Sequence, residues 1–242
     1  MSITAQILSK LAEFDTPTIA NVIELFNVVP RNRGYMDSRI RSAFPELPPM
    51  VGFATTACFR ADAPPAGGDV YGSLEKQIDQ FAELPGPAVV VFQDLDDPAV
   101  AATFGEVMCS VYKAFGSTGL ITSGAGRDLL QVRAIGYPVF TNGTICSHGY
   151  CHVLHIGMSV RVGGLVVNTG DLLHGDANGV TRIPLEIAAE VADIARELVA
   201  AEQIILDYVR TAQKPTVAAL TAARKEFANA MSTLAQRVHR TA

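Results

Sequence analysis

Apolar residues recur at helical spacing near both ends of the chain and in strand-like runs between them. Helical spacing covers residues 3–13, and a second helix is expected to begin at Asp15 as its N-cap, with Pro17 in the first turn. Residues 185–211 and 215–239 are rich in alanine and amphipathic. We therefore predict N-terminal helices and two long C-terminal helices, of a kind that often packs against a neighbouring subunit.

The middle of the chain alternates strand-like and helix-like segments. VGFATTACFRA alternates like a strand, and PAVVVFQD is a β-branched run of the kind that is buried on both faces of a sheet. Residues 105–116 are expected to form a helix that a glycine ends, TGLITSG the next strand, and residues 127–136 a short helix. His174 and Asp176 fall in a predicted hairpin turn. This order of elements predicts an α/β protein.

No repeat or linker divides the sequence, so we predict one domain over residues 1–242, with a core at about 15–185 and C-terminal helices at about 185–240. The 49% of hydrophobic and 18% of charged residues are typical of a globular protein. The net charge of −5, without a long basic cluster, argues against nucleic acid or an anionic membrane as partner. The first residues lack the pattern of a signal peptide, so we expect a soluble, cytoplasmic protein.

The cysteines have no C-x-x-C spacing and lie mostly in apolar runs, which indicates reduced core thiols rather than zinc ligands or disulfides. They are Cys58, Cys109, Cys146 and Cys151. The segment GDVYGS, residues 68–73, lacks the preceding strand and the glycine spacing of a dinucleotide-binding loop.

Three histidines follow one another at spacings of four and three: His148, His152 and His155. On a helix they would share a face that could bind a metal, but Gly149 and the β-rich flanks favour a strand or loop. We therefore expect no three-histidine metal site. His148 stays a candidate pocket residue because it follows the end of a predicted strand.

The stretch LITSGAGRDLL joins a predicted strand to a predicted helix and places Arg127 beside Asp128. Open α/β sheets carry ligand-binding groups at the carboxyl ends of their strands, so this pair is a candidate site. The alternative is an ordinary helix start, at which Asp128 stabilises the helix N-terminus and Arg127 points to solvent. A second such junction, VAATFGEVM, adds Gly105 and the carboxylate of Glu106.

The main-chain amides at the start of the second junction would bind an anion such as a substrate carboxylate. They belong to Gly105, Glu106, Val107 and Met108. Two carboxylates, one arginine and these amides together suit a hard divalent cation and a 2-oxo acid.

The run from Glu106 to Asp128, GEVM…GLITSGAGRD, resembles the D-x20-R-D signature of the RraA-like proteins, which include 4-hydroxy-4-methyl-2-oxoglutarate / 4-carboxy-4-hydroxy-2-oxoadipate aldolases. The later VGGLVVNTGDLLHGDANGVTRIP is similar to the family's tail, and the resemblance covers roughly residues 15–185. It implies an α/β sandwich with a swivelling β/β/α core, assembled as a trimer or a dimer of trimers, with active sites at subunit interfaces.

The resemblance also implies roles for the candidate residues. Asp128 would hold a divalent cation, Mg²⁺ or Mn²⁺, partly through waters, and Glu106 would ligate it directly or orient a water. Arg127 would bind the carboxylate and keto oxygen of the substrate. Two departures from the aldolase pattern concern this site: Glu106 stands where these aldolases have Asp, and Gln131 stands where they have an acidic residue. The site for a metal and an oxo acid is thus better supported than the particular aldolase substrate.

We therefore predict a metal-dependent carbon–carbon lyase of the class II aldolase or decarboxylase type. It would cleave a 4-hydroxy-2-oxo acid to release pyruvate, decarboxylate oxaloacetate, or do both, through an enolate that the metal and Arg127 stabilise. The alternative is a non-catalytic protein-binding regulator, because RraA itself resembles this chain and inhibits a ribonuclease.

Overall fold

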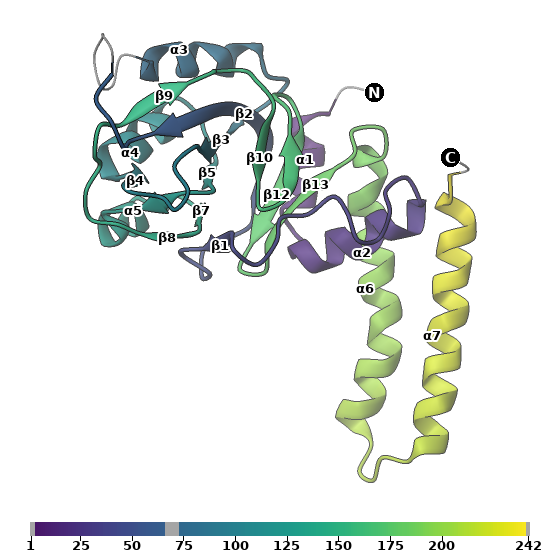
Figure 1. The fold of residues 1–242 in the computed structure, drawn as a ribbon. Coiled ribbons are helices and arrows are strands. Elements are labelled where there is room, and N and C mark those ends of the chain that lie inside the picture. The colour runs from purple at the N-terminus through teal and green to yellow at the C-terminus, as the bar shows by residue number, and fades with distance from the viewer. Residues whose placement is uncertain (1–2, 66–72, 241–242) are drawn as a thin grey trace.

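The computed structural model of the protein describes residues 3–65 and 73–240 (Figure 1). Most of the segment GDVYGS lies outside the described residues. Within the described residues, no helix combines the length and the apolar character needed to cross a membrane.

An eight-stranded mixed sheet forms the centre of the protein. Its strands β2, β3, β5 and β7 run parallel. At one edge β1 pairs antiparallel with β7, and at the other β12 pairs antiparallel with both β2 and β13. In spatial order the strands are β1 (Arg41–Ser42), β7 (Val139–Thr141), β5 (Gly119–Thr122), β3 (Ala88–Asp94), β2 (Met50–Arg60), β12 (Leu172–Asp176) and β13 (Gly179–Ile183), and β9 (His152–Leu154) also pairs with β2.

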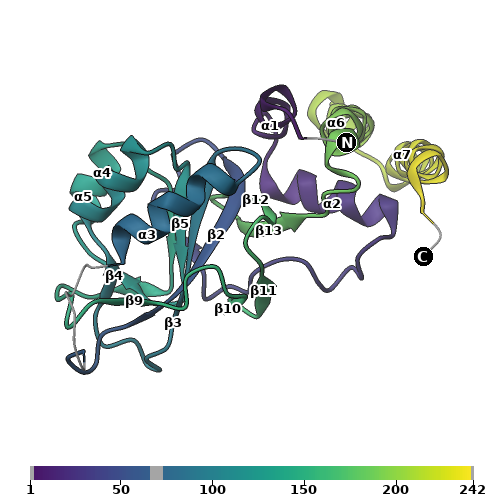
Figure 2. The same ribbon diagram turned by 90° about the horizontal axis from the view of Figure 1, so that it is seen from above.

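Helices cover one face of this sheet and also lie beyond one of its edges (Figures 1 and 2). The helices over the face are α3 (Leu74–Asp79), α4 (Glu106–Ala114) and α5 (Leu129–Ala134), with the short 3-10 helix η1 (Gln80–Glu83) after α3. The helices beyond the edge are α1 (Ala5–Leu11), α2 (Thr16–Phe26), α6 (Ala188–Thr211) and α7 (Val217–Val238). The predicted terminal helices and the predicted α/β class are confirmed.

Strand β3 shows why its β-branched sequence suits the centre of the sheet. Val90 and Phe92 point to the side of α4 and α5, where they join one core cluster. Val89 and Val91 point to the opposite side, where they pack with residues of the hairpin β10 (Val160–Val162) and β11 (Leu165–Val167). Since successive side chains of a strand alternate between faces, only a strand covered on both sides places all four in the core.

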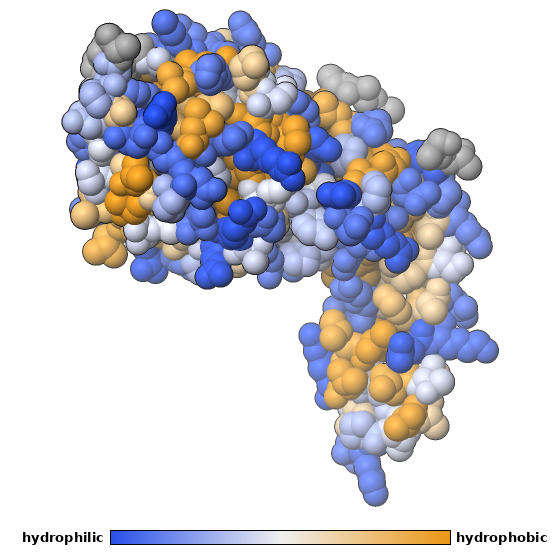
Figure 3. Space-filling view, in the orientation of Figure 1, coloured by the Kyte–Doolittle hydropathy of each residue, from blue (hydrophilic) through white to orange (hydrophobic). Residues whose placement is uncertain are grey.

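The helices beyond the edge form a third core cluster with β12 and β13. Asp15 caps α2 as predicted, and its Oδ1 accepts a hydrogen bond from the Thr18 amide at 2.8 Å. The distal parts of α6 and α7 extend away from the body as a helical hairpin (Figure 1), where Leu206, Val209 and Val217 are exposed. Apolar side chains gather on this hairpin in the surface view (Figure 3). Packing of these helices against a second subunit remains a prediction.

The prediction that His174 and Asp176 are turn residues is wrong. Both are buried in β12, and the turn to β13 lies after Asp176. The imidazole of His174 contacts the Thr16 hydroxyl at 2.9 Å and the Leu11 carbonyl oxygen at 3.2 Å. The carboxylate of Asp176 accepts a hydrogen bond from the Thr16 amide at 2.9 Å. These polar groups therefore attach the start of α2 to the sheet.

The chain forms a second, three-stranded parallel sheet after it leaves the carboxyl ends of β3, β5 and β7. It consists of β4 (Ala102–Phe104), β6 (Ala125–Gly126) and β8 (Gly143–Thr144). Helix α4 follows β4 after one residue, Gly105, and α5 follows β6 after two residues, Arg127 and Asp128. Both junctions predicted from the sequence thus meet at one end of this small sheet.

Asp94 ends β3 with its Oδ2 atom buried and without a hydrogen-bond partner among the described residues. Burial raises the pKa of this carboxyl from 3.8 to about 6. Between about pH 4 and pH 6 the folded protein therefore keeps a proton on Asp94 that the unfolded chain has lost, so this residue lowers the free energy of unfolding as the pH rises from 4 to 6 and leaves it lowered above pH 6.

We expect Asp94→Asn to raise the free energy of unfolding by roughly 1 kcal/mol at pH 8, less than the full shift would give because the side chain is partly solvated. The gain should shrink at pH 5, where the native carboxyl is already protonated. Urea unfolding at the two pH values measures both effects. Asp207→Asn, at an exposed position of α6, is the matched control. A gain that is the same at both pH values would contradict the assignment.

Candidate active site

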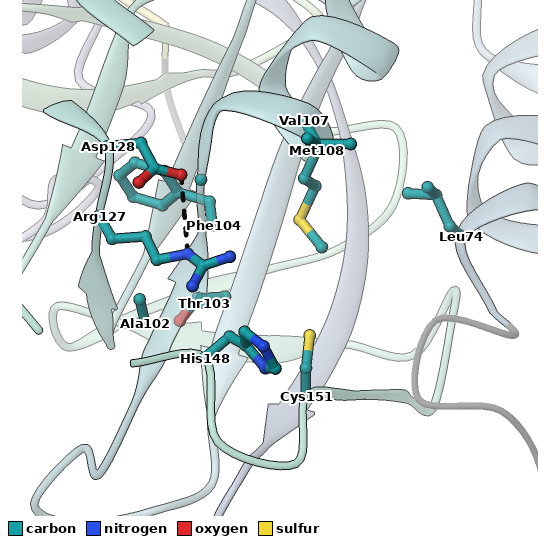
Figure 4. A pocket seen from close by; sticks show the side chains of 11 residues that line it. Leu74, Ala102, Thr103, Phe104, Val107, Met108, Arg127, Asp128, His148 and Cys151 are labelled. Carbon is teal, nitrogen blue, oxygen red and sulfur yellow. Dashed lines mark ion pairs between the residues drawn. The ribbon is translucent and has the colours of Figure 1, made fainter. Parts of the chain in front are cut away.

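A cavity of about 420 Å³ opens where β4 and β6 lead into α4 and α5 (Figure 4). It brings together the two strand-to-helix junctions and the loop before β9. Its lining residues are Leu74, Ala102, Thr103, Phe104, Gly105, Val107, Met108, Arg127, Asp128, His148 and Cys151.

Asp128 does not act as an ordinary cap of its own helix. It occupies the N-cap position of α5 with a left-handed backbone (φ 54°), and its side chain makes no capping hydrogen bond there. Its Oδ2 atom instead accepts a hydrogen bond from the Glu106 amide, the first of α4, at 3.1 Å. The carboxylate thus lies at the positive end of the neighbouring helix, where a negative charge is favoured. The alternative reading, in which Asp128 stabilises its own helix start, does not describe this geometry.

Gly105 makes this contact possible. A Cβ atom built on Gly105 would lie 2.6 Å from Asp128 Oδ2 and 3.1 Å from Arg127 Nε. Any residue with a side chain at this position would therefore displace the carboxylate, the guanidinium or both. The glycine allows two segments that are distant in sequence to approach each other at the cavity.

Arg127 is held by its main chain and keeps its guanidinium in the cavity. Its amide donates to the Phe104 carbonyl oxygen at 3.1 Å, which ties the end of β6 to the end of β4. Its Nε atom lies 3.7 Å from Asp128 Oδ2, and its side chain is 30% exposed. The guanidinium extends toward the space between Thr103 and His148 (Figure 4). Since no hydrogen bond joins its Nη atoms to another described residue, it keeps donors available for a ligand.

The side chain of Glu106 is exposed and does not line the cavity. What Glu106 contributes is its amide, which donates to Asp128. The amides of Val107 and Met108 also belong to the first turn of α4, where no intrahelical acceptor is available. Gln131 is exposed on α5, outside the lining residues. The predicted amide site at residues 105–108 therefore lies at the cavity, with one of its donors already used.

His148 lies at the cavity as an exposed residue whose Nδ1 is 2.8 Å from the Gly149 carbonyl oxygen. His152 and His155 are not among the lining residues. In the described parts of the chain, no group of three or more His, Cys, Asp or Glu side chains could hold a metal ion. Of the two predicted metal ligands, the structure therefore places the carboxylate of Asp128 at the cavity and that of Glu106 outside it.

The apolar lining is the part of the site that the sequence did not single out. Phe104 and Cys151 are buried, and Leu74 lies opposite the charged pair (Figure 4). Burial raises the pKa of the Cys151 thiol to about 11, although the nearby Arg127 lowers it, so the thiol is neutral at physiological pH. Cys109 and Cys58 are also buried, and Cys146 is exposed. Cys151 therefore forms part of an uncharged wall.

The fold and this cavity define a mixed α/β protein whose charged residues lie at two adjoining strand-to-helix junctions. The family model of the RraA-like proteins (Aldolase/RraA) matches residues 19–182, and the chain belongs to this family. The family resemblance and the fold expected from the sequence are thus confirmed.

Two named proteins are similar to about half of this chain. The chain is 33% identical over 120 residues to a Halalkalibacterium halodurans protein named "Putative 4-hydroxy-4-methyl-2-oxoglutarate aldolase", across 49% of this chain and 55% of that protein. It is 26% identical over 128 residues to the Legionella pneumophila protein DlpA, across 52% of this chain and 20% of that one. The chain therefore spans about half or less of the length of these curated relatives.

Solved structures share the fold. An uncharacterized protein from Pseudomonas syringae superposes with a TM-score of 0.72 at 21% identity, over 93% of this chain and 95% of that one. Streptomyces coelicolor RraAS2, described as an unusual member of the RNase ES inhibitor RraA protein family, has a TM-score of 0.68 at 20% identity, over 88% and 99% of the two chains. At such identities the similarity shows the fold alone.

Gly105→Ala should lower the free energy of unfolding by roughly 0.5 to 1.5 kcal/mol, because the added methyl group forces the Asp128 carboxylate away from the Glu106 amide and breaks their hydrogen bond. Gly143→Ala is the matched control, since no atom lies within 4 Å of the Cβ that it would add. We expect the control to change stability by less than about 0.5 kcal/mol. Equal urea midpoints for the two variants would mean that Asp128 moves aside without cost.

Proposed function

We propose that this protein is a divalent-metal-dependent lyase that acts on a small 2-oxo acid. The reaction is retro-aldol cleavage of a 4-hydroxy-2-oxo acid to release pyruvate, decarboxylation of oxaloacetate, or both. The observation that carries this proposal is the pair of Arg127 and Asp128, held against the first amide of α4 at the wall of a cavity. A cation with available donors beside a carboxylate suits a substrate that develops negative charge.

The donor set fits Mg²⁺ or Mn²⁺ better than zinc. Asp128 accepts the Glu106 amide through Oδ2 only, so its Oδ1 atom is available as an oxygen ligand. Mg²⁺ usually keeps several waters and takes one or two carboxylates together with substrate oxygens, so a single aspartate is compatible with it. When bound, such an ion would act as a Lewis acid on the carboxylate and keto oxygens of the substrate. Glu106 would reach it only through waters or a change of side-chain rotamer.

Arg127 would bind the substrate carboxylate and keto oxygen through its Nη groups. Its planar guanidinium can donate to two oxygens at once. The Val107 and Met108 amides would donate hydrogen bonds to the other oxygen of the same carboxylate, as expected for the first turn of a helix. This arrangement orients the keto group toward the positive charge of Arg127.

In the cleavage step, a water held by Asp128 would take the proton of the C4 hydroxyl. The C3–C4 bond breaks, the electron pair of the C4 oxygen forms the new carbonyl group, and the bond's electrons pass into the enolate of pyruvate. Arg127 stabilises the enolate oxygen, and protonation at C3 completes the release of pyruvate. Loss of CO₂ from oxaloacetate leaves the same enolate, which explains how one site could support both reactions.

We further propose a homotrimer or a dimer of trimers, with an acidic residue from a neighbouring subunit completing the site. The exposed apolar residues of the α6–α7 hairpin offer a surface for such an assembly. The alternative function, a non-catalytic regulator of the RraA type, draws support from the fold shared with RraAS2. A protein that only binds a partner does not require Asp128 to contact the start of α4 at the wall of a cavity. We therefore favour the enzyme.

The test of the function is pyruvate release from a panel of 4-hydroxy-2-oxo acids and oxaloacetate, with Mg²⁺ and with excess EDTA. We expect activity only with the metal ion, and we expect Asp128→Ala to abolish it. Asp207→Ala, at an exposed position of α6, should retain full activity. Turnover that persists in excess EDTA would refute metal dependence, and no turnover of any substrate would favour the regulator.

Arg127→Lys should lower kcat/KM by about a hundredfold or more, because an ammonium group cannot replace the two-point contact of the guanidinium. The loss should appear in kcat as well as in KM, since the enolate charge develops only in the transition state. Arg133→Lys is the matched control, because Arg133 lies on α5, the helix that follows Arg127, and pairs with Glu46 at the surface. Wild-type turnover of Arg127→Lys with oxaloacetate would place Arg127 outside the chemistry.

A further inference from the structure

We propose that the cavity selects 2-oxo acids with an apolar group on C4 over 2-oxo acids in which C4 carries a second carboxylate. This inference rests on the proposed function and specifies its substrate class. It starts from the uneven distribution of charge around the cavity. Arg127 is the one lysine or arginine among the described lining residues, and Asp128 lies beside it.

The wall away from this pair is apolar. Met108 and Cys151 extend into the cavity from above and below in Figure 4, and Leu74 closes it on the side away from Arg127. Met108 is 7% exposed and Cys151 3% exposed, so both present desolvated surface. Val107 also lines the cavity while 77% of it is exposed, which places it at the rim. A ligand held at Arg127 would therefore direct its remaining atoms toward apolar side chains.

The cations that line the cavity determine how many carboxylates of a substrate can be paired. The C1 carboxylate and the keto oxygen use the donors of Arg127 in the proposed function. A second carboxylate on C4, as in 4-hydroxy-4-methyl-2-oxoglutarate, would then lie against Met108 and Leu74, and the described lining residues include no lysine or arginine besides Arg127 to pair with it. Burial of an unpaired charge is strongly unfavourable, whereas an alkyl group at the same place gains from leaving water. The apolar substrate is thus favoured by both effects.

The experiment compares two ligands of similar size. In 4-methyl-2-oxopentanoate an isopropyl group occupies the place of the distal carboxylate end of 2-oxoglutarate, and both keep the 2-oxo acid group. Titration calorimetry in the presence of Mg²⁺ should give a Kd for 4-methyl-2-oxopentanoate at least about tenfold lower than that for 2-oxoglutarate, as expected for a difference of this kind in an apolar pocket.

A charge placed on the wall should reverse the preference. Val107→Lys puts a cation at the rim and should strengthen 2-oxoglutarate binding by about tenfold or more relative to 4-methyl-2-oxopentanoate. Phe115→Lys is the matched control, because Phe115 lies at the C-terminal end of the same helix and is 62% exposed, outside the lining residues. It should leave the Kd ratio of the wild type unchanged.

The outcomes separate the two proposals. If the wild type binds 2-oxoglutarate as tightly as 4-methyl-2-oxopentanoate or more tightly, the apolar preference is refuted while the 2-oxo acid site stands. A loss of that tight binding in His148→Ala would then assign the second carboxylate to His148. If neither ligand binds with Mg²⁺ present, the proposed function and this inference fall together.

Discussion

The site depends on one hydrogen bond, from the Glu106 amide to the carboxylate of Asp128. It joins the start of α4 to the turn after β6, two segments that meet because β4 and β6 are parallel neighbours. The carboxylate can approach the amide this closely because residue 105 has no side chain. The carboxylate gains from the positive end of the helix, and its Oδ2 atom lies 3.7 Å from Nε of the adjacent Arg127.

This arrangement produces a site with two unlike halves. The charged half comes from residues at the junctions, where main-chain geometry holds Arg127 and Asp128 in place. The apolar half comes from α4, from Leu74 at the start of α3 and from Cys151 before β9. Since three separate parts of the chain supply it, the apolar half can change its shape and size without disturbing the charged pair. Within one fold, the reacting group and the rest of the substrate can therefore be selected separately.

Much of the fold could be predicted from the sequence because the patterns were local. The runs of β2 and β3, the N-cap Asp15 and the long terminal helices each follow from neighbours along the chain. The sequence does not reveal the burial of His174 and Asp176, because Gly and Asn nearby indicate a turn, whereas their partners, Thr16 and Leu11, lie far away in sequence. A polar residue that is satisfied across such a distance carries no local signal.

The same limit applies to the site. Spacing in the sequence singled out Arg127, Asp128 and Gly105, but it could not distinguish a contribution from the main chain of Glu106 from one by its carboxylate. The structure makes this distinction, and it changes the meaning of the departure from Asp at this position. A longer acidic side chain that points to solvent leaves the amide, and thus the position of Asp128, unaltered. Its effect on chemistry must then come from waters or from a neighbouring subunit, whereas the core of the site depends on an amide that residues other than proline also provide.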